Sequence, residues 1–236
     1  MLLIHSAQIP GKYLSGIETL FPGLERIPFP GTQDVYPSIR SHPDIFFCQL
    51  KNDTLVHSPR VDMSLLSDLR KRGIRLLASS SSPFGHYPNT ASLNAARVGR
   101  LLLHRQDITD PKLKEVSREE GLTLVGCAQG YTRCSVVPVK EEALITSDMG
   151  IEYAANEAGI GTLLVSPCNV ILPGEACGFI GGATGILPEG DVLFLGDIRL
   201  HPDFKAIEAF LSRYDVGYLY LAGLPLYDAG SLIFIS

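Results

Sequence analysis

Cys134 is the residue whose type and surroundings best suit covalent chemistry in this sequence. A cysteine attacks as its thiolate, so catalysis needs a nearby cation or polar donor that lowers the pKa of the thiol, or a base that takes its proton. Arg133 and Ser135 flank Cys134, but in a strand their side chains would point to the opposite face. His42 is therefore the candidate base. The alternative is an inert thiol, because free cysteine is among the residues most often buried.

Asp44 and Asp228 are candidates for a pair of carboxylates that would hold a positively charged substrate. Asp44 would act together with Cys134 and His42 as the third catalytic residue. The alternative for both carboxylates is structural, because acidic residues at strand starts and turns often accept hydrogen bonds from local backbone N–H groups.

Four further residues are candidates for hydrogen bonds to a substrate, namely Tyr87, Asn89, Thr184 and Ser231. Asn89 and Thr184 could equally fix the loops in which they lie. The glycine-rich segment 181–185 (GGATG) invites comparison with a phosphate-binding loop. Such loops open a helix, whereas this segment leads into an apolar run, so close backbone approach is the favoured interpretation.

His5, His57 and His104 occupy equivalent places in three similar apolar runs. Equivalent places in a repeated architecture spread side chains apart, and no H-E-x-x-H or other short histidine spacing is present. We therefore expect structural roles for these histidines, no metal site and no cofactor.

The spatial relation of these candidates depends on a repeat. Five short apolar runs close with polar residues: 2–6 (LLIHS), 54–58 (TLVHS), 101–105 (LLLHR), 143–148 (ALITSD) and 192–197 (VLFLGD). A helix-like stretch follows each run and ends at a glycine, which is the usual left-handed helix stop. These glycines are Gly23, Gly73, Gly121, Gly159 and Gly217. A further apolar strand comes after each glycine.

A third strand precedes each run through a tight turn, at 44–48, 92–98, 134–139 and 184–187. For the fifth unit this strand is 230–235, at the opposite end of the chain from its partner run. The predicted fold is therefore α/β, a five-unit pseudo-symmetric ββαβ propeller forming one domain over residues 1–236. Pairing of the N- and C-terminal strands would close it and remove exposed edges. The leading residues of the first strands would then gather at one mouth, around a central pocket for a small molecule.

Five such units resemble the guanidino-group-modifying enzymes, or penteins. That group includes arginine and agmatine deiminases, dimethylarginine dimethylaminohydrolase, amidinotransferases and a non-catalytic ribosome-binding translation factor. The chain looks more closely like a family of unknown function that has been assigned this fold. The matching stretches are 130–137 (GYTRCSVV), 178–185 (GFIGGATG), 196–197 (GD), 201–203 (HPD) and 230–231 (GS).

The resemblance implies a cysteine-dependent hydrolase or transferase acting on a small guanidino, amidino or amide compound. In the known enzymes the nucleophilic cysteine lies near the C-terminus, where this sequence has Phe234, and the segment 178–182 lacks their catalytic histidine. Any chemistry must therefore use other residues, with Cys134 as the candidate. The alternative is a non-catalytic binding or scaffold protein with a protein partner.

Composition restricts the other function classes. The net charge is −5, and the 20 lysines and arginines are scattered, which does not indicate binding to nucleic acid. No apolar stretch approaches the roughly 20 residues that span a bilayer. The 5 cysteines form no C-x-x-C pair, and the first residues do not resemble a signal peptide. A cytoplasmic location with reduced thiols is expected.

Overall fold

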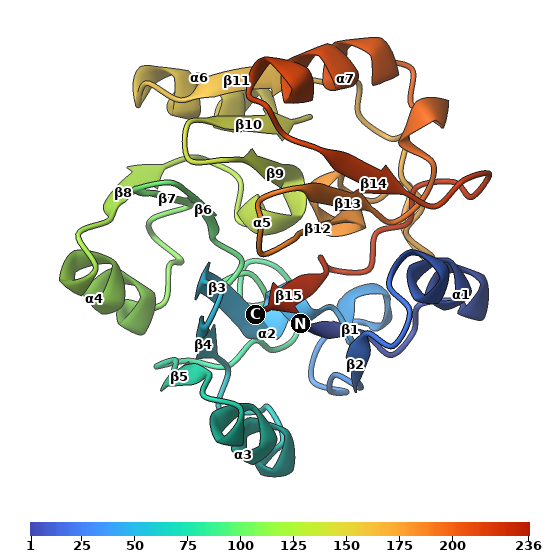
Figure 1. Ribbon diagram of the computed structural model, residues 1–236. Helices are drawn as coiled ribbons and strands as arrows, with labels where there is room; N and C mark the ends of the chain where they lie inside the picture. Colours follow the sequence, from blue (N-terminus) through green and yellow to red (C-terminus); the bar gives the residue numbers. More distant parts are fainter.

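The computed structural model describes residues 1–236, and its fifteen strands form five separate three-stranded sheets (Figure 1). The strands are β1 (Leu2–Ser6), β2 (Glu25–Phe29), β3 (Phe47–Lys51), β4 (Thr54–His57), β5 (Arg75–Ala78), β6 (Ala96–Val98), β7 (Leu101–His104), β8 (Thr123–Gly126), β9 (Val136–Val139), β10 (Ala143–Thr146), β11 (Gly161–Leu164), β12 (Thr184–Ile186), β13 (Val192–Phe194), β14 (Tyr218–Tyr220) and β15 (Ile233–Ile235). The α-helices are α1 (Gly11–Leu20), α2 (Pro43–Phe46), α3 (Met63–Lys71), α4 (Pro111–Glu119), α5 (Thr132–Ser135), α6 (Met149–Glu157) and α7 (Phe204–Arg213). Short 3-10 helices are η1 (Pro37–Ile39), η2 (Gly181–Ala183) and η3 (Ile198–Leu200).

Every sheet has the same connectivity. The middle strand pairs antiparallel with one neighbour and parallel with a strand that it reaches through a helix, as β4 does with β3 and β5. A parallel neighbour requires such a crossover, and here it is always one of the outer helices α1, α3, α4, α6 or α7. The predicted repeat of five strand–strand–helix–strand units is therefore confirmed.

The fifth unit combines the two ends of the chain. β1 pairs antiparallel with β15, with Leu3 opposite Phe234, and parallel with β2. The predicted pairing of the terminal strands is confirmed, and both termini lie at the middle of the molecule in Figure 1. The structure nevertheless contains no closed sheet, because each ladder of hydrogen bonds ends at its third strand.

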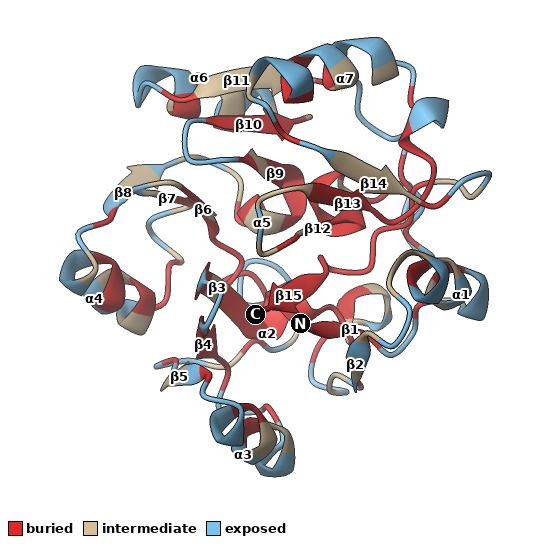
Figure 2. Ribbon diagram, in the orientation of Figure 1, coloured by how far each residue is buried: buried red, intermediate tan, exposed pale blue.

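Neighbouring units meet chiefly through side chains, with an isolated backbone bridge between Gly185 and Leu232. Each of five hydrophobic clusters joins residues of two units: Val56 with Leu102, for example, or Leu144 with Val98. The series returns to its start, since one cluster joins Leu3 to Leu193 and another joins Ile4 to Leu55. Buried residues accordingly follow the inner and middle strands of each sheet, while the outer strands and the outer helices are largely intermediate or exposed (Figure 2).

Four of the five inner strands begin two to four residues later than predicted, whereas β12 begins at Thr184 as expected. His42 caps the one-turn helix α2, which contains Asp44, and Cys134 lies in the one-turn helix α5. η2 similarly precedes β12. A single buried turn is too short to show helical periodicity, so its apolar residues look like the start of the strand that follows. The longer helices α3 and α6 begin after Asp62 and Asp148, whose carboxylates accept backbone N–H bonds.

The expectation that all thiols are reduced is also wrong. Cys168 and Cys177 form a disulfide across a nine-residue separation, with their Cα atoms 4.9 Å apart. Cys48, Cys127 and Cys134 are free. Spacing alone gave no sign of this bond, because the two residues approach only when the loop between them folds back. Disulfides are rare in the cytosol, so the bond gives no support to the predicted cytoplasmic location.

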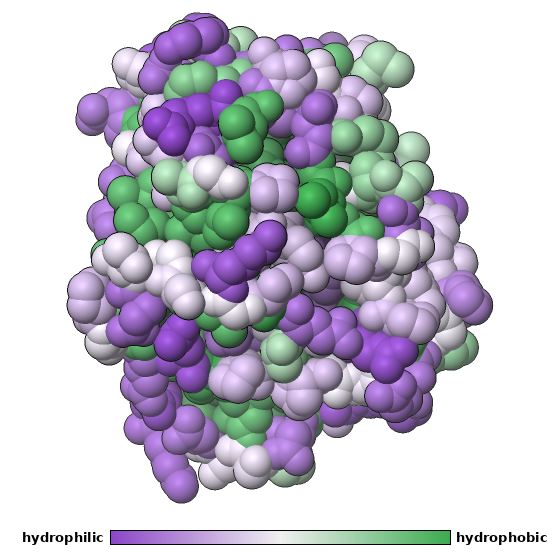
Figure 3. Space-filling view, turned by 90° about the vertical axis from the view of Figure 1, so that its right-hand side faces the viewer, coloured by the Kyte–Doolittle hydropathy of each residue, from purple (hydrophilic) through white to green (hydrophobic).

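None of the helices combines the length and the apolar character that crossing a bilayer requires. Hydrophilic residues cover much of the face shown in Figure 3, with apolar residues gathered in patches between them.

Replacing Phe234 with alanine should lower the free energy of unfolding by about 3–5 kcal/mol. Phe234 is 1% exposed and packs in the cluster that also contains Leu3, so its loss leaves a cavity beside the terminal strand pair. Urea denaturation measures the change. Leu200→Ala is the matched control, because Leu200 is 64% exposed and should cost less than about 0.5 kcal/mol. Equal losses in the two variants would contradict the described packing.

Candidate functional site: a buried acidic cluster beside a pocket

The candidate residues are held in place by two segments that lie far apart in the sequence. The α2 segment brings in His42 and Asp44, and the backbone N–H of Asp44 donates to the carbonyl of Gly230 at 3.1 Å. Gly230 has a φ of +69°, and a Cβ there would lie 2.1 Å from the Cβ of His42. Only glycine allows this approach, which fixes Asp228 and Ser231 beside α2.

Four side chains form what we call the central cluster: Asp44, Asn94, Cys134 and Ser231. The Cys134 thiol donates to Oδ2 of Asp44 at 3.1 Å, and the Ser231 hydroxyl donates to the same oxygen at 2.7 Å. Nδ2 of Asn94 donates to Sγ of Cys134 at 3.2 Å, while its Oδ1 accepts the Cys134 backbone N–H at 3.1 Å. The thiol is thus held between an amide and a carboxylate.

The electrostatics of the central cluster keep the thiol protonated. Burial raises the pKa of Cys134 well above its ordinary value, and the negative charges of Asp44 and Asp228 raise it further. Burial also raises the pKa of Asp44, whose Oδ1 atom has no hydrogen-bond partner. The Arg133 guanidinium interacts electrostatically with Asp44 and Cys134, but burial and the two carboxylates outweigh it at the thiol. A nucleophilic thiolate would therefore have to form by proton transfer to Asp44.

His42 lies beside Asp228 rather than against the thiol. Its Nδ1 atom is 3.9 Å from Oδ1 of Asp228, beyond hydrogen-bond distance, and has no partner. Burial lowers the pKa of His42 to about 4, so the ring is neutral at pH 7 and the contact is not an ion pair. Burial raises the pKa of Asp228 to about 6, although N–H bonds from Phe179 and Gly230 oppose the increase.

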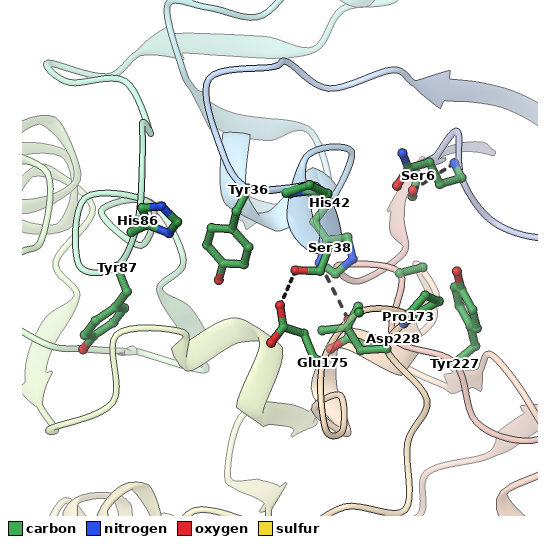
Figure 4. Close-up of a pocket in the computed structure, with 15 residues that line it drawn as sticks. Ser6, Tyr36, Ser38, His42, His86, Tyr87, Pro173, Glu175, Tyr227 and Asp228 are labelled. Atoms are coloured by element: carbon green, nitrogen blue, oxygen red, sulfur yellow. Dashed lines mark hydrogen bonds and ion pairs between the residues drawn. The ribbon is translucent and has the colours of Figure 1, made fainter.

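A pocket with a cavity volume of about 680 Å³ opens above His42 and Asp228 (Figure 4). Its walls are aromatic and acidic, and they include Tyr36, Ser38, His86, Tyr87, Glu175 and Tyr227. The ring of Tyr36 stacks on that of His86, with centroids 5.7 Å apart. Neither lysine nor arginine lines the pocket.

A second cavity, of about 610 Å³, lies at the hairpin-turn ends of the inner strands. Asp44 and Ser231 line it together with Arg133 and turn residues such as Lys51 and Lys140. The residues expected at one mouth are therefore divided between two cavities. Cys134 is 3% exposed and lines neither.

The other predicted site residues differ in whether they reach a cavity. Tyr87 is 41% exposed at the rim of the first pocket, whereas Asn89 is exposed and lines neither cavity. The buried Thr184 hydroxyl donates to the carbonyl of Gly181 at 2.8 Å, which matches the loop-fixing alternative. A Cβ at Gly182 would lie 2.0 Å from Oδ1 of Asp228, so these glycines serve close backbone approach. His5, His57 and His104 lie on the separate strands β1, β4 and β7.

The sequence did not reveal Asn94 and Glu175 as residues of the site, and it wrongly placed Arg133 in a strand. Asn94 is 40 residues from Cys134, and no local pattern connects them. Because Cys134 is helical, strand alternation does not apply, and Nη1 of Arg133 donates to the carbonyls of Val136 and Gly181 at 3.0 and 3.1 Å. Glu175 enters through the loop that the disulfide closes.

A protein-family model matches this chain over residues 7–233. The chain belongs to the family of unknown function DUF6873. The resemblance to an uncharacterised family is thereby confirmed. No curated protein matches the chain.

Solved structures with the pentein fold resemble this DUF6873 protein. DDAH from Pseudomonas aeruginosa, in a complex with citrulline, has a TM-score of 0.54 at 7% identity, covering 93% of this chain and 91% of that chain. The inosamine-phosphate amidinotransferase StrB1 from Streptomyces griseus has a TM-score of 0.55 at 12% identity, covering 100% of this chain and 93% of that chain. SxtG, a Microseira wollei amidinotransferase of the saxitoxin biosynthetic pathway, has a TM-score of 0.54 at 10% identity, covering 93% of this chain and 88% of that chain. At such identities the likeness shows the fold alone.

In the native DUF6873 protein we expect Cys127 to react first with a thiol reagent near pH 7. Burial raises the pKa of all three free thiols, to about 12 for Cys48 and well above the ordinary value for Cys134. Cys127, however, is the least buried of the three and the most accessible to a reagent. Mass spectrometry after timed labelling assigns the sites. Cys127→Ser should remove the fast phase and Cys134→Ser should leave it unchanged. Labelling of Cys134 faster than a model thiol would overturn this description.

His42 and Asp228 should give opposite pH dependences of stability. The pKa of His42 falls from 6.5 to about 4, so its contribution is lost as the pH drops through this range. The pKa of Asp228 rises from 3.8 to about 6, so its contribution is lost as the pH increases through this range. Each of the two contributions to the free energy of unfolding amounts to about 3 kcal/mol, because a shift of one pKa unit corresponds to about 1.4 kcal/mol.

The two contributions oppose each other in the wild type, and single variants should separate them. Between pH 6.5 and 4, the free energy of unfolding of Asp228→Asn should fall more steeply than that of the wild type, because only the His42 effect remains. That of His42→Gln should rise relative to the wild type. Urea denaturation across the pH range measures both, and identical slopes in the two variants would contradict the assignment.

Proposed function

We propose that this protein is a cysteine-dependent hydrolase or transferase that acts on a small guanidino or amidino compound. The observation that carries the proposal is the contact between Sγ of Cys134 and Oδ2 of Asp44 at 3.1 Å, which pairs a nucleophile with a base. A second carboxylate, that of Asp228, borders a pocket of suitable size. The fold of amidinotransferases and DDAH gives further support, as an analogy.

We further propose that the five units form a pseudo-symmetric propeller and that residues 1–236 are one domain. The cyclic series of hydrophobic clusters supports this arrangement, since it joins each unit to the next and the last to the first. A propeller of this kind would surround the central cluster with all five units, so that its residues are held by packing rather than by one loop.

Binding would depend on charge. At pH 7 Asp228 is mainly ionised and His42 is neutral, so the floor of the pocket is negative. A guanidinium or amidinium group suits this floor because its N–H groups can donate to a carboxylate in a bidentate manner. Tyr36 and Tyr227 would contribute their ring faces to a cation. Tyr87 and Ser231 are proposed as further contacts, at the rim and beneath the floor.

The proposed reaction starts when the proton of the Cys134 thiol passes to Asp44. The sulfur then bonds to the central carbon of the bound cation, and the C–N bond to the leaving amine breaks as that nitrogen takes up the proton. In a hydrolase, water subsequently breaks the C–S bond and restores the thiol; in a transferase, an acceptor amine does so. Because His42 lies against Asp228, its proposed part is to orient the substrate and to accept one of its N–H groups.

A second candidate function is that of a non-catalytic binding protein on the same fold, with a protein partner. It is favoured by the position of Cys134, which is 3% exposed and lines neither cavity. This alternative predicts ligand binding without turnover.

Turnover should depend on Cys134 and binding on Asp228. We expect a screen of guanidino and amidino compounds, read out by release of ammonia or amine, to find a substrate. Cys134→Ser should reduce its turnover at least 1,000-fold, since a weak hydroxyl replaces the nucleophile, while affinity stays within about threefold; both are order-of-magnitude values. Asp228→Asn should weaken binding by about 10- to 100-fold.

Cys127→Ser is the matched control, because Cys127 is a free thiol outside the central cluster. It should retain wild-type turnover. Binding without any turnover would select the second candidate. Turnover that survives in Cys134→Ser would exclude Cys134 as the nucleophile.

A further inference from the structure

We infer that the preferred ligand of the pocket carries two positive groups and no carboxylate: a guanidino or amidino group at one end and an amine at the other. This inference rests on the proposed function and specifies its substrate class. It follows from the charges of the lining, which include the carboxylates of Asp228 and Glu175 but no lysine or arginine.

The floor of the pocket has unused hydrogen-bonding capacity for a cation. Asp228 is 1% exposed and receives N–H bonds from Phe179 at 2.9 Å and Gly230 at 3.0 Å. Beside it, Nδ1 of the buried His42 has no partner, although buried polar atoms are normally hydrogen-bonded. His42 and Asp228 lie together in Figure 4, so a planar group with several N–H donors could serve both.

The rim of the pocket offers a second carboxylate. Oε1 of Glu175 accepts a hydrogen bond from the Ser38 hydroxyl at 2.6 Å, while Glu175 makes no ion pair with any lysine or arginine. Its charge is therefore uncompensated. Glu175 and Asp228 line the same pocket and lie near each other in Figure 4, so a single small ligand could reach both carboxylates.

The backbone holds Glu175 in this position. The disulfide between Cys168 and Cys177 closes the loop that carries it. Within this loop, Ile171 forms a bridge with Tyr227, the residue before Asp228. The backbone N–H of Asp228 donates to the carbonyl of Ile171 at 2.9 Å. The floor and the rim of the pocket are thus connected through one short stretch of backbone.

A ligand with a carboxylate would find no partner here. A carboxylate that leaves water requires a cation or several N–H donors, and arginine is the usual residue for this purpose. Arg105 does approach the rim, because it donates to the Tyr87 hydroxyl at 2.9 Å. However, its guanidinium group is already bound to both carboxylate oxygens of Asp107 at 2.9 Å. Discrimination against amino acids is the expected result.

Three probes test the inference by isothermal titration calorimetry in Cys134→Ser, which prevents turnover. Agmatine carries a guanidinium group and an amine, butylguanidine lacks the amine, and arginine adds a carboxylate to the agmatine skeleton. We expect affinities in the order agmatine, butylguanidine, arginine, with arginine at least about 10-fold weaker than agmatine. Glu175→Gln should lower agmatine affinity about 10-fold and leave butylguanidine unchanged.

Glu189→Gln is the matched control, because Glu189 is an exposed glutamate in a hairpin turn outside the pocket. It should change none of the affinities. If arginine binds as tightly as agmatine, or if Glu175→Gln weakens both amine-free and amine-bearing probes equally, the inference is wrong while the proposed function stands. If no guanidino compound binds, both fail together.

Discussion

The pairing of β1 with β15 is the interaction on which the rest of the structure depends. It brings together segments more than 200 residues apart, with Leu3 opposite Phe234, and it completes the fifth sheet. The two hydrophobic clusters on either side of this pair join the unit that the chain ends form to its two neighbouring units. Without the pair, the loop before β15 would have no fixed place beside α2. Asp228 and Ser231 would then lose their relation to His42 and Asp44.

That arrangement buries acidic groups near the centre, and burial governs their chemistry. Asp44, Asp228 and Cys134 are buried with little access to water, so burial raises the pKa of each. A cysteine enzyme more often lowers the pKa of its thiol with a cation. Here the thiol is instead hydrogen-bonded to a carboxylate, so the base must be Asp44 itself if the cluster is catalytic. This difference separates the site from the cysteine and histidine positions of the better-known pentein enzymes.

The pocket is built only in part from the segments that hold the central cluster. Its floor is built by the terminal loop and α2, while its rim comes from the loop that the Cys168–Cys177 disulfide closes. Aromatic rings between these two parts provide a wall without positive charge. The charge of the lining therefore says more about ligands than the fold does, because the pentein fold serves several reactions.

The sequence by itself determined the five-unit repeat, the pairing of the terminal strands and four of the five left-handed glycines after the outer helices; after α7 the left-handed residue is Asp215 rather than Gly217. These follow from short-range patterns: apolar runs, turn residues and glycines recur in each unit. It also identified Cys134, Asp44 and Ser231, which meet through hydrogen bonds to one carboxylate oxygen. Only the tertiary structure decided that Cys134 sits in a helical turn, that His42 faces Asp228, and that Asn94 and Glu175 take part. The reason is physical: hydrogen-bond partners and pKa values depend on distances between units, and no local pattern of residues encodes those distances.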